Sequence, residues 1–402
     1  MKKVSLEEAA AALRAAAGRT APEWVELDDA VGRVSAQAHL AELPQPPFSR
    51  SPLDGYAVRA QDLQGANADS PAVLNVTATV YAGQCPAQMV TPGTAVRIMT
   101  GSMIPPGADC VVRQEHTDMG HPLVRVFVPE AAGNNICFRG EEYSAGTCLI
   151  PEGARLDAAA VAVLGGAGMS RACVRSRPRV GVVVTGDEVT SAGNPLQAGR
   201  IYDSNLHYLK ARLRQLGAEL CTAVYAQDDV HAIEDCLCGE AARSLDLIVT
   251  TGGISVGEKD LLVKTLENMG AKLLFQGVSI KPGMPTLAAL LGDTVVLGLS
   301  GNPFSAAAAF ELLIHPLFAE FYGCESMDLQ EVHAKICDAF PKPSPCRRFL
   351  RGRMTPSGIA VPGAQANGQM LSMIGCNCLV DIPAGSPPVP AGQWVRGLMW
   401  KD

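Results

Sequence analysis

The stretch Arg179-Val180-Gly181-Val182-Val183-Val184-Thr185-Gly186-Asp187-Glu188 decides the fold of this chain. Its nearly continuous apolar run predicts a strand buried on both faces, and Thr185-Gly186 predicts a turn directly after it. Downstream, helices are expected at 204–216, 230–243, 259–268 and 304–319, and strands at 219–224, 245–250 and 295–299. Strands that alternate with helices indicate a parallel sheet covered by helices on both sides, so we expect a three-layer α/β domain over residues 177–327.

The flanking sequence predicts three further parts. Ser5 and Glu8 have the spacing of a capping box, so a helix is expected at 5–17, within a helical segment made of residues 1–44 and 136–176. Four prolines at 41–56 interrupt that segment, and apolar alternation at 73–80 and 123–128 predicts a small β lobe over 45–135. Short apolar segments between proline-rich spacers predict a C-terminal β-barrel over 328–402.

Composition excludes several classes of protein. Of the 402 residues, 48% are hydrophobic and 18% charged, which indicates a folded chain with a substantial core, and the net charge of -7 argues against nucleic-acid binding through a basic surface. The 13 cysteines include no CxxC pair, so a zinc ribbon is not expected. We see no signal peptide and no membrane span, so we expect a cytoplasmic protein.

Three loops follow strands of the expected sheet. They are Thr185–Glu188, Thr250–Asp260 and Ser300–Ser305. Because ligands of open parallel sheets bind beyond the carboxyl ends of strands, these glycine-rich loops should lie at one edge. Their amide and hydroxyl groups, with the helix N-termini that follow, predict a cradle for a phosphate or similar anion, although each loop alone is equally consistent with a tight turn and a helix cap.

Carboxylates lie on the same loops. Glu188 and Asp260 would repel a phosphate unless a Mg²⁺ lies between them, because Mg²⁺ is commonly held by one or two carboxylates together with substrate phosphates. Asp203 and Asp229 are expected nearby, although Asp229 is also placed to cap a helix. The sequence therefore predicts a metal-dependent anion site.

Other nucleotide and hydrolase motifs fit less well. Neither GxxxxGK[ST] nor a GxGxxG after the first strand occurs, which argues against a P-loop or a dinucleotide fold. Gly253-Ile254-Ser255-Val256-Gly257 matches the GxSxG of α/β-hydrolases, but its candidate bases, His315 and His333, lie within a helix and beyond the sheet. We keep the hydrolase as a less favoured alternative.

Eight motifs in order give a resemblance to a known family. They are SPLDGYA, RIMTGSMIPPGAD, NNICFRGEE, VVVTGDE, GRIYDSN, TTGGISVGEKD, KPGMPT and SGNPFSA. As a set they resemble the molybdopterin molybdenumtransferase family, which includes MoeA and the E domain of gephyrin. The resemblance implies an elongated four-domain subunit with a MoaB/MogA-like α/β domain, and a homodimer whose active site lies between the α/β domain of one subunit and the β lobe of the other. The implied reaction takes adenylylated molybdopterin, hydrolyses the adenylate with release of AMP in a step that depends on Mg²⁺ or another divalent metal, and inserts molybdate.

The resemblance also implies which residues act. The catalytic set is Asp54, Thr100, Glu142, Glu188, Asp229 and Asp260, of which Glu188 and Asp260 would bind the metal. The substrate-binding set is Thr185, Gly186, Asp203, Ser204, Asn205, Thr251, Gly252, Gly253, Ser255, Lys281, Pro282, Gly283, Pro285, Gly301, Asn302, Pro303 and Ser305, with Ser305 near the molybdate. Transient contact with molybdoenzymes or their chaperones is a further implication.

The chain departs from the family pattern at several positions. Ser300 replaces a proline, Cys137 an arginine and Met284 a frequent lysine, and residues 365–368 replace a serine-rich stretch. Two cationic positions are therefore lost, for which Arg347 or Arg348 in the C-terminal domain is the expected compensation, because the family keeps an arginine of that domain close to molybdate. These losses leave open a paralogue that inserts tungstate, or one that binds the pterin without catalysis.

Overall fold

The computed structural model describes residues 3–239, 244–253 and 261–400, which form two compact units. Unit 1 contains residues 1–37, 152–158 and 171–402, and unit 2 contains residues 38–151 and 159–170. The predicted site motifs that follow sheet strands all belong to unit 1.

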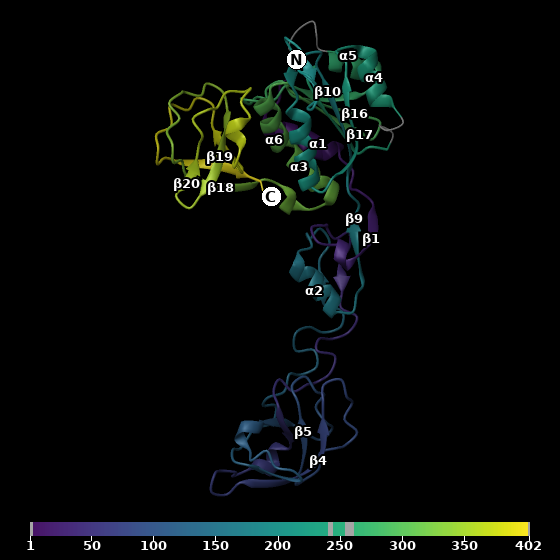
Figure 1. Cartoon of the computed structure of the whole chain (residues 1–402), viewed down its shortest axis with the longest axis vertical. Coiled ribbons are helices and arrows are strands. Elements are labelled where there is room, and N and C mark those ends of the chain that lie inside the picture. Colours follow the sequence, from purple (N-terminus) through teal and green to yellow (C-terminus); the bar gives the residue numbers. More distant parts are fainter. Residues whose placement is uncertain (1–2, 240–243, 254–260, 401–402) are drawn as a thin grey trace. The chain divides into compact units, whose positions relative to one another are not determined.

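A six-stranded sheet organises unit 1 (Figure 1). The strand order is β13-β10-β14-β17-β16-β15, and β13, β10, β14 and β17 run parallel. The bounds are β10 Arg179–Thr185, β13 Glu219–Ala226, β14 Leu247–Thr251, β15 Lys272–Gln276, β16 Leu287–Leu291 and β17 Thr294–Leu299. The strand predicted from the opening stretch is β10, and the predicted parallel pairing is confirmed for these four strands.

The expectation of an all-parallel sheet is wrong at one edge. β16 pairs antiparallel with both β17 and β15. Only Gly292 and Asp293 separate β16 from β17, and Gly292 has a φ of 60°. A two-residue connection can join only antiparallel neighbours, so this hairpin requires a mixed sheet.

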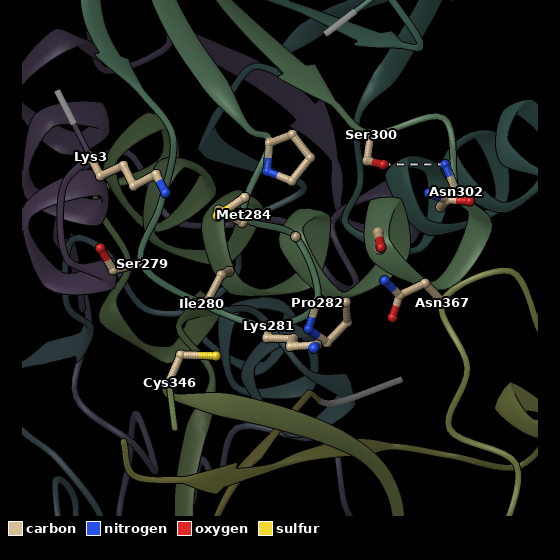
Figure 2. Close-up of a pocket in the computed structure, with 13 residues that line it drawn as sticks. Lys3, Ser279, Ile280, Lys281, Pro282, Met284, Ser300, Asn302, Cys346 and Asn367 are labelled. Atoms are coloured by element: carbon tan, nitrogen blue, oxygen red, sulfur yellow. Dashed lines mark hydrogen bonds between the residues drawn. The ribbon is translucent and has the colours of Figure 1, made fainter. Parts of the chain in front are cut away.

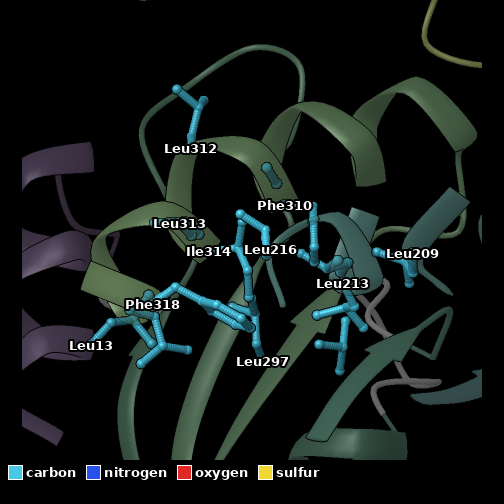
Figure 3. Packing of buried hydrophobic residues seen from close by; sticks show 14 of the residues in the cluster. Leu13, Leu209, Leu213, Leu216, Leu297, Phe310, Leu312, Leu313, Ile314 and Phe318 are labelled. Carbon is cyan, nitrogen blue, oxygen red and sulfur yellow. The ribbon is translucent and has the colours of Figure 1, made fainter. Parts of the chain in front are cut away.

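Helices cover both faces of this sheet, as the strand-helix alternation predicted. The bounds are α1 Leu6–Ala16, α3 Asn205–Gln215, α4 Val230–Cys238, α5 Leu261–Asn268 and α6 Pro303–Tyr322. Val182 and Val184 of β10 pack in one core with α1, α3 and α6, whereas Val183 packs in a second core with α4 and α5. Figure 3 shows the first core, in which Leu13 of α1 and Phe318 of α6 lie together. Because successive side chains of β10 point to opposite faces of the sheet, they pack alternately into the two helical layers.

α6 is the longest helix that the structure describes, and its length and composition alone would allow it to cross a membrane. Almost all of it is buried inside unit 1, where it packs against α1 and α3. The helix therefore has the surroundings of a core helix.

The amino-terminal helix has the predicted cap. Ser5 Oγ accepts from the Glu8 N–H at 3.1 Å, and Glu8 Oε2 accepts from the Ser5 N–H at 2.7 Å. Before the cap, Val4 pairs in parallel with Val278. The start of the chain is thus fixed to the segment that follows β15.

The C-terminal part of unit 1 contains a five-stranded sheet in the order β18-β22-β21-β19-β20. The bounds are β18 Gln330–Lys335, β19 Arg348–Thr355, β20 Gly358–Ala360, β21 Cys378–Ile382 and β22 Trp394–Met399. It has its own core, which includes Leu350 and Val380. The short apolar segments that predict this part include 349–350, 378–380 and 394–395, and each of these lies on a strand. Closure into a barrel remains a prediction.

Unit 2 contains the predicted β lobe, a five-stranded sheet in the order β6-β3-β5-β4-β7. The bounds are β3 Gly55–Val58, β4 Ala72–Val80, β5 Thr94–Ile98, β6 Cys110–Arg113 and β7 Leu123–Val126. A Cβ on Gly55 would lie 1.9 Å from Val112 O, so the close approach of β3 to β6 requires glycine there. Helix α2 spans Ala158–Gly166 and ends on two consecutive glycines.

Short strand pairs complete the two units. They are β1 Pro22–Glu26 with β9 Arg171–Arg175, β11 Val189–Thr190 with β12 Ile201–Tyr202, and β2 His39–Leu40 with β8 Cys148–Ile150.

Candidate active site

The loops after β10, β14 and β17 meet at one edge of the sheet, as the sequence predicted. Thr185 Oγ1 donates to Thr251 O at 3.3 Å, and the Gly252 N–H donates to Leu299 O at 3.1 Å. Gly252 has a φ of 87°, and a Cβ there would lie 2.3 Å from Thr185 O. A side chain at 252 would therefore force the first two loops apart.

The loop before α3 joins the same edge through Asn205. Its Nδ2 donates to Gly301 O at 2.9 Å. Asp203 Oδ1 accepts from the Asn205 N–H at 2.8 Å, so this carboxylate, rather than the Ser204 hydroxyl, caps α3. Asp203 Oδ2 accepts from the Tyr225 hydroxyl at 3.1 Å. Burial, and next the nearby charge of Asp203, raise the Tyr225 pKa to about 12, so the phenol stays protonated as a donor.

Glu188 is the last residue of the first loop. Its Oε2 is 3.0 Å from the position that a Cβ on Gly186 would occupy, and the residue is exposed. The proposed partner Asp260 and the site residue Ser255 lie outside the described residues, whereas Gly253 is described, with a φ of 66°. Within the described ranges no group of three His, Cys, Asp or Glu residues gathers as a metal site. A carboxylate oxygen at this glycine-rich turn fits Mg²⁺, which needs few protein ligands when substrate phosphates supply the rest.

Asp229 makes the bonds of a helix cap. Its Oδ1 accepts from the His231 N–H at 2.9 Å and from the Ala232 N–H at 3.1 Å, at the start of α4. The capping interpretation left open by the sequence is thus present in the structure, and a catalytic role for Asp229 remains a prediction.

A cavity of about 500 Å³ lies beside the third loop (Figure 2). It takes in most of the predicted KPGMP and SGNPFS residues. Its lining consists of Lys3, Ser279, Ile280, Lys281, Pro282, Gly283, Met284, Pro285, Ser300, Asn302, Ser305, Cys346 and Asn367. Among the described residues, the structure brings Lys281, Pro282, Gly283, Pro285, Asn302 and Ser305 together here, while Thr185, Gly186 and Thr251 belong to the neighbouring loop cluster and not to this lining.

The electrostatics of this cavity favour an anion. Asn302 is the N-cap and Pro303 the first residue of the 20-residue helix α6, so the positive end of the helix dipole lies at the cavity. Lys281 adds a full charge, and Ser300 and Ser305 add hydroxyl groups. None of the described residues that line the cavity is acidic. The arrangement can hold a small oxyanion.

Sequence reasoning missed four of the lining residues. Lys3, Ser279, Ile280 and Cys346 reach the cavity from the start of the chain, from the segment after β15 and from the residue two before β19. Only the charge of Lys3 was a usable signal in the sequence, since nothing in its neighbours indicates the pairing of Val4 with Val278.

Neither of the arginines expected to compensate lies in this lining. Arg347 donates to both carboxylate oxygens of Asp381, at 2.9 and 2.8 Å, and to Glu7 Oε1 at 2.6 Å. Arg348 instead lines a second cavity of about 790 Å³, together with Lys342. Within the described ranges, the residue of this segment that faces the first cavity is Cys346, and compensation by either arginine remains a prediction.

Arg351 was not singled out from the sequence, yet it supports the loop that carries Asn367. Its side chain is fully buried, donates to Ser372 Oγ at 2.6 Å and to Ala366 O at 2.8 Å, and lies 3.5 Å from the centre of the Phe304 ring. Burial lowers its pKa to about 10, so it remains charged at neutral pH. The hydrogen bonds of Arg351 therefore hold in place the loop through which Asn367 contributes to the wall of the cavity.

In unit 2, two predicted catalytic residues are in direct contact. Asp54 Oδ1 accepts from the Thr100 N–H at 2.7 Å and from its hydroxyl at 2.8 Å. The hydrogen bond from the Thr100 backbone, followed by the one from its hydroxyl, lowers the pKa of Asp54. Glu142 is exposed, and its N–H donates to Gln45 O at 2.9 Å. The carboxylate of Asp54 is thus held ionised, with Oδ2 left for another contact.

The geometry argues against the hydrolase alternative. His315 is buried, its Nδ1 lies 2.8 Å from Met327 O, and its Nε2 lies 3.0 Å from Glu311 Oε2. Glu311 also accepts from Arg212 Nε at 2.8 Å. His333 is exposed on β18. His315 is therefore a member of a core cluster in which both of its ring nitrogens already have partners, whereas a catalytic base needs one nitrogen free to take a proton.

Family models match nearly the whole chain. The MoeA N-terminal region (domain I and II) matches residues 4–168, a probable molybdopterin binding domain matches 181–320, and the MoeA C-terminal region (domain IV) matches 333–400. The first two models cover, in the same order along the chain, the eight motifs on which the family resemblance rests.

Curated proteins and solved structures agree with these models. The chain is 32% identical over 390 residues to a molybdopterin molybdenumtransferase of Bacillus subtilis strain 168, covering 94% of this chain and 90% of the relative. It is also 32% identical over 375 residues to that of Staphylococcus aureus strain MRSA252, covering 92% and 89%. A crystal structure of a molybdopterin biosynthesis MoeA protein from Pyrococcus horikoshii superimposes with a TM-score of 0.89 at 29% identity, covering 100% of both chains.

Proposed function

The chain belongs to the MoeA family, and from this membership we infer that it is a molybdopterin molybdenumtransferase, an enzyme of molybdenum cofactor biosynthesis. The observation that carries the proposal at the level of residues is the cavity beside α6. It combines Lys281, Ser305 and a helix N-terminus with a lining free of acidic groups among the described residues. Molybdate, a small dianion, fits that chemistry.

We propose that the pterin substrate lies along the adjoining sheet edge. Glycines 186, 252 and 301 let the backbone approach a phosphate closely, and the hydrogen bonds of Thr185 and Asn205 fix the loops in place. The dithiolene of the pterin would then face the molybdate cavity, since Gly301 and Asn302 belong to the same loop. These residues orient the substrate, and the chemistry at the dithiolene belongs to the pterin itself.

The proposed substrate is adenylylated molybdopterin, with AMP released during insertion. We propose that Glu188 and Asp260 hold a Mg²⁺, which would supply charge neutralisation at the pyrophosphate. In this proposal Glu188 orients the phosphate chain against the Thr185–Gly186 turn, and Asp54 supplies an ionised carboxylate held by Thr100.

The test combines product and cofactor measurements. Purified protein is incubated with adenylylated molybdopterin, Mg²⁺ and molybdate, and AMP and the reconstitution of an apo-molybdoenzyme are measured. We expect both with the wild type, and loss of both in Glu188→Gln and Asp260→Asn. Glu267→Gln, at an exposed position of α5, is the matched control and should retain wild-type rates.

Three results would contradict the proposal in different ways. Intact adenylate after incubation with tightly bound pterin would identify a binding protein without turnover. Reconstitution with tungstate but not with molybdate would identify a tungsten insertase. Wild-type rates in both carboxylate variants would remove the metal site from these residues.

We also propose that the protein is a cytoplasmic homodimer that makes transient contact with molybdoenzymes or their chaperones. The resemblance implies that each active site uses the α/β domain of one subunit and the β lobe of the other. Co-expressed Asp54→Asn and Lys281→Gln subunits should then regain part of the activity that each lacks alone. A monomer by light scattering would contradict the proposal.

A further inference from the structure

The start of the chain forms part of the wall of the oxyanion cavity. The Val4 N–H donates to Gly277 O at 3.1 Å, and the Ser279 N–H donates to Val4 O at 2.8 Å. Ser279 itself lines the cavity, and α1 begins at Leu6 directly after this pairing. The backbone at Val4 is therefore held from both sides, and the residue before it is placed at the cavity.

The stem of Lys3 passes over a glycine. A Cβ on Gly277 would lie 3.2 Å from Lys3 Cγ, so the bare backbone at 277 leaves the room that the lysine stem needs. Figure 2 shows the Lys3 side chain extending toward Met284, which lines the same cavity. The ammonium group is thus directed into the cavity while the stem lies on its wall.

The charges of the lining match those of the proposed substrate. Within the part of the chain that the structure describes, Lys3 and Lys281 are the two cationic side chains of the lining, and none is acidic. Molybdate carries two negative charges at neutral pH. Lysine offers a compact point charge with three donors, which suits a tetrahedral oxyanion.

We propose that Lys3 is a second cationic contact for the oxyanion substrate, in addition to Lys281, and that it sets the affinity for molybdate. This inference rests on the proposed function and adds to it a residue from outside the sheet motifs. Because Val4 is held by backbone hydrogen bonds, replacing the Lys3 side chain leaves the segment anchored.

The experiment exchanges the charge between two positions of the lining. The variants are Lys3→Met, Met284→Lys and the double variant, with Lys264→Met at an exposed position of α5 as the control. Molybdate binding is measured by equilibrium dialysis without pterin, and the KM for molybdate and the kcat are measured with adenylylated molybdopterin.

We expect Lys3→Met to raise the Kd and the KM for molybdate about five-fold, equivalent to about 1 kcal/mol, with kcat within two-fold of the wild type. The double variant should return to within two-fold of the wild-type affinity, because a lysine at 284 places a charge in the same cavity. Added salt should weaken binding more in the wild type than in Lys3→Met. The control should match the wild type in each measurement.

Unchanged Kd and KM in Lys3→Met would overturn the inference while leaving the enzyme assignment intact. A fall in kcat with unchanged molybdate affinity would also overturn it, since Lys3 would then act on another step. If the wild type itself neither binds molybdate nor yields cofactor, the proposed function fails first, and the wild-type measurement identifies that case.

Discussion

Two hydrogen bonds to the carboxylate of Asp54 favour its ionised form. Both come from Thr100 and both reach the same oxygen, and they lower the pKa of Asp54. A depressed pKa means that the ionised form persists to lower pH than in the unfolded chain. Any step that needs this carboxylate ionised is therefore maintained as pH falls, until pH reaches the folded pKa.

Thr100→Val removes the hydroxyl bond and keeps the backbone bond. We predict that the acid limb of the pH-rate profile moves to higher pH, because the pKa of Asp54 rises toward its ordinary value when one donor is lost. Thr77→Val on β4 is the control, since the Thr77 hydroxyl bonds to Ala95 O and not to an acid. An acid limb that stays in place would show that Asp54 does not limit the rate.

The residues that line the cavity differ in whether the sequence could predict them. Lys281 and Ser305 were predicted because each belongs to a contiguous motif, and the structure places both in one cavity. Lys3 and Cys346 were missed because their positions depend on pairing between distant segments, which a local pattern does not record. The ion pairs of Arg347 were likewise beyond prediction, since Glu7 and Asp381 come from opposite ends of the chain.

At the scale of elements, the loop after β14 depends on a glycine that cannot be replaced. Gly252 combines a φ of 87° with an approach to Thr185 O that excludes a Cβ. A side chain at 252 would cost free energy in two ways: through the strain of a left-handed backbone, and through the steric clash of its Cβ with Thr185 O. Another glycine of unit 1 allows the backbone strain to be measured without a clash. Gly270 has a φ of 72° and no atom within 4 Å of an added Cβ.

We predict that Gly252→Ala abolishes cofactor formation and lowers the free energy of unfolding by about 3 kcal/mol, whereas Gly270→Ala costs about 1 kcal/mol and keeps activity. Urea denaturation and the AMP assay measure the two effects. Equal losses in the two variants would show that the approach to Thr185 is unimportant.

The contact between α3 and α6 depends on a buried charge cluster. Glu311 is fully buried and accepts from Tyr208 at 2.6 Å, from Arg212 at 2.8 Å and from His315 at 3.0 Å. Burial alone would raise the pKa of Glu311, but the hydrogen bonds from His315 and Arg212 hold it lowered. The stability that this carboxylate contributes is therefore present above its unfolded pKa and is lost as pH falls through the folded value.

We predict that Glu311→Ala lowers the free energy of unfolding by about 3–5 kcal/mol at pH 7, because the buried donors Arg212 and His315 and the half-buried Tyr208 lose their acceptor. The difference from the wild type should shrink as pH falls below about 4. Chemical denaturation at several pH values tests this, with the exposed Glu267→Ala as a control expected within about 0.5 kcal/mol. A difference that is constant with pH would contradict the role given to the ionised form.

The order of elements was predictable to a large extent. β10, β14 and β17, with the helices after them, follow from apolar runs and loop signals, because a strand buried on both faces leaves that pattern. The strands β15 and β16 were missed, since short runs such as 287–291 carry no periodicity that separates strand from buried helix. The antiparallel direction of β16 follows only from the short turn at 292–293, which joins β16 to β17.

At the scale of the whole molecule, two units with separate cores should unfold separately. Val112 is fully buried in the core of unit 2, and Val249 is fully buried in the core of unit 1. Each residue can therefore report on its own unit.

We predict two transitions in scanning calorimetry. Val112→Ala should lower one midpoint and Val249→Ala the other, each by an amount that corresponds to about 2 kcal/mol. A single transition that shifts in both variants would mean that the units unfold as one cooperative body.

The packing of α1 against α6 has a consequence for synthesis on the ribosome. α1 ends at Ala16 and α6 begins at Pro303, so roughly 290 residues must be translated before the helix that covers Leu13 exists. At about 5–20 residues per second this takes about 15–60 s. Throughout that interval the nascent chain exposes the apolar face of its first helix, and unit 2 is complete before the core of unit 1 closes. Helix α1 is thus translated early but is among the last elements to reach its native surroundings, and we expect it to be a segment on which a holdase chaperone acts.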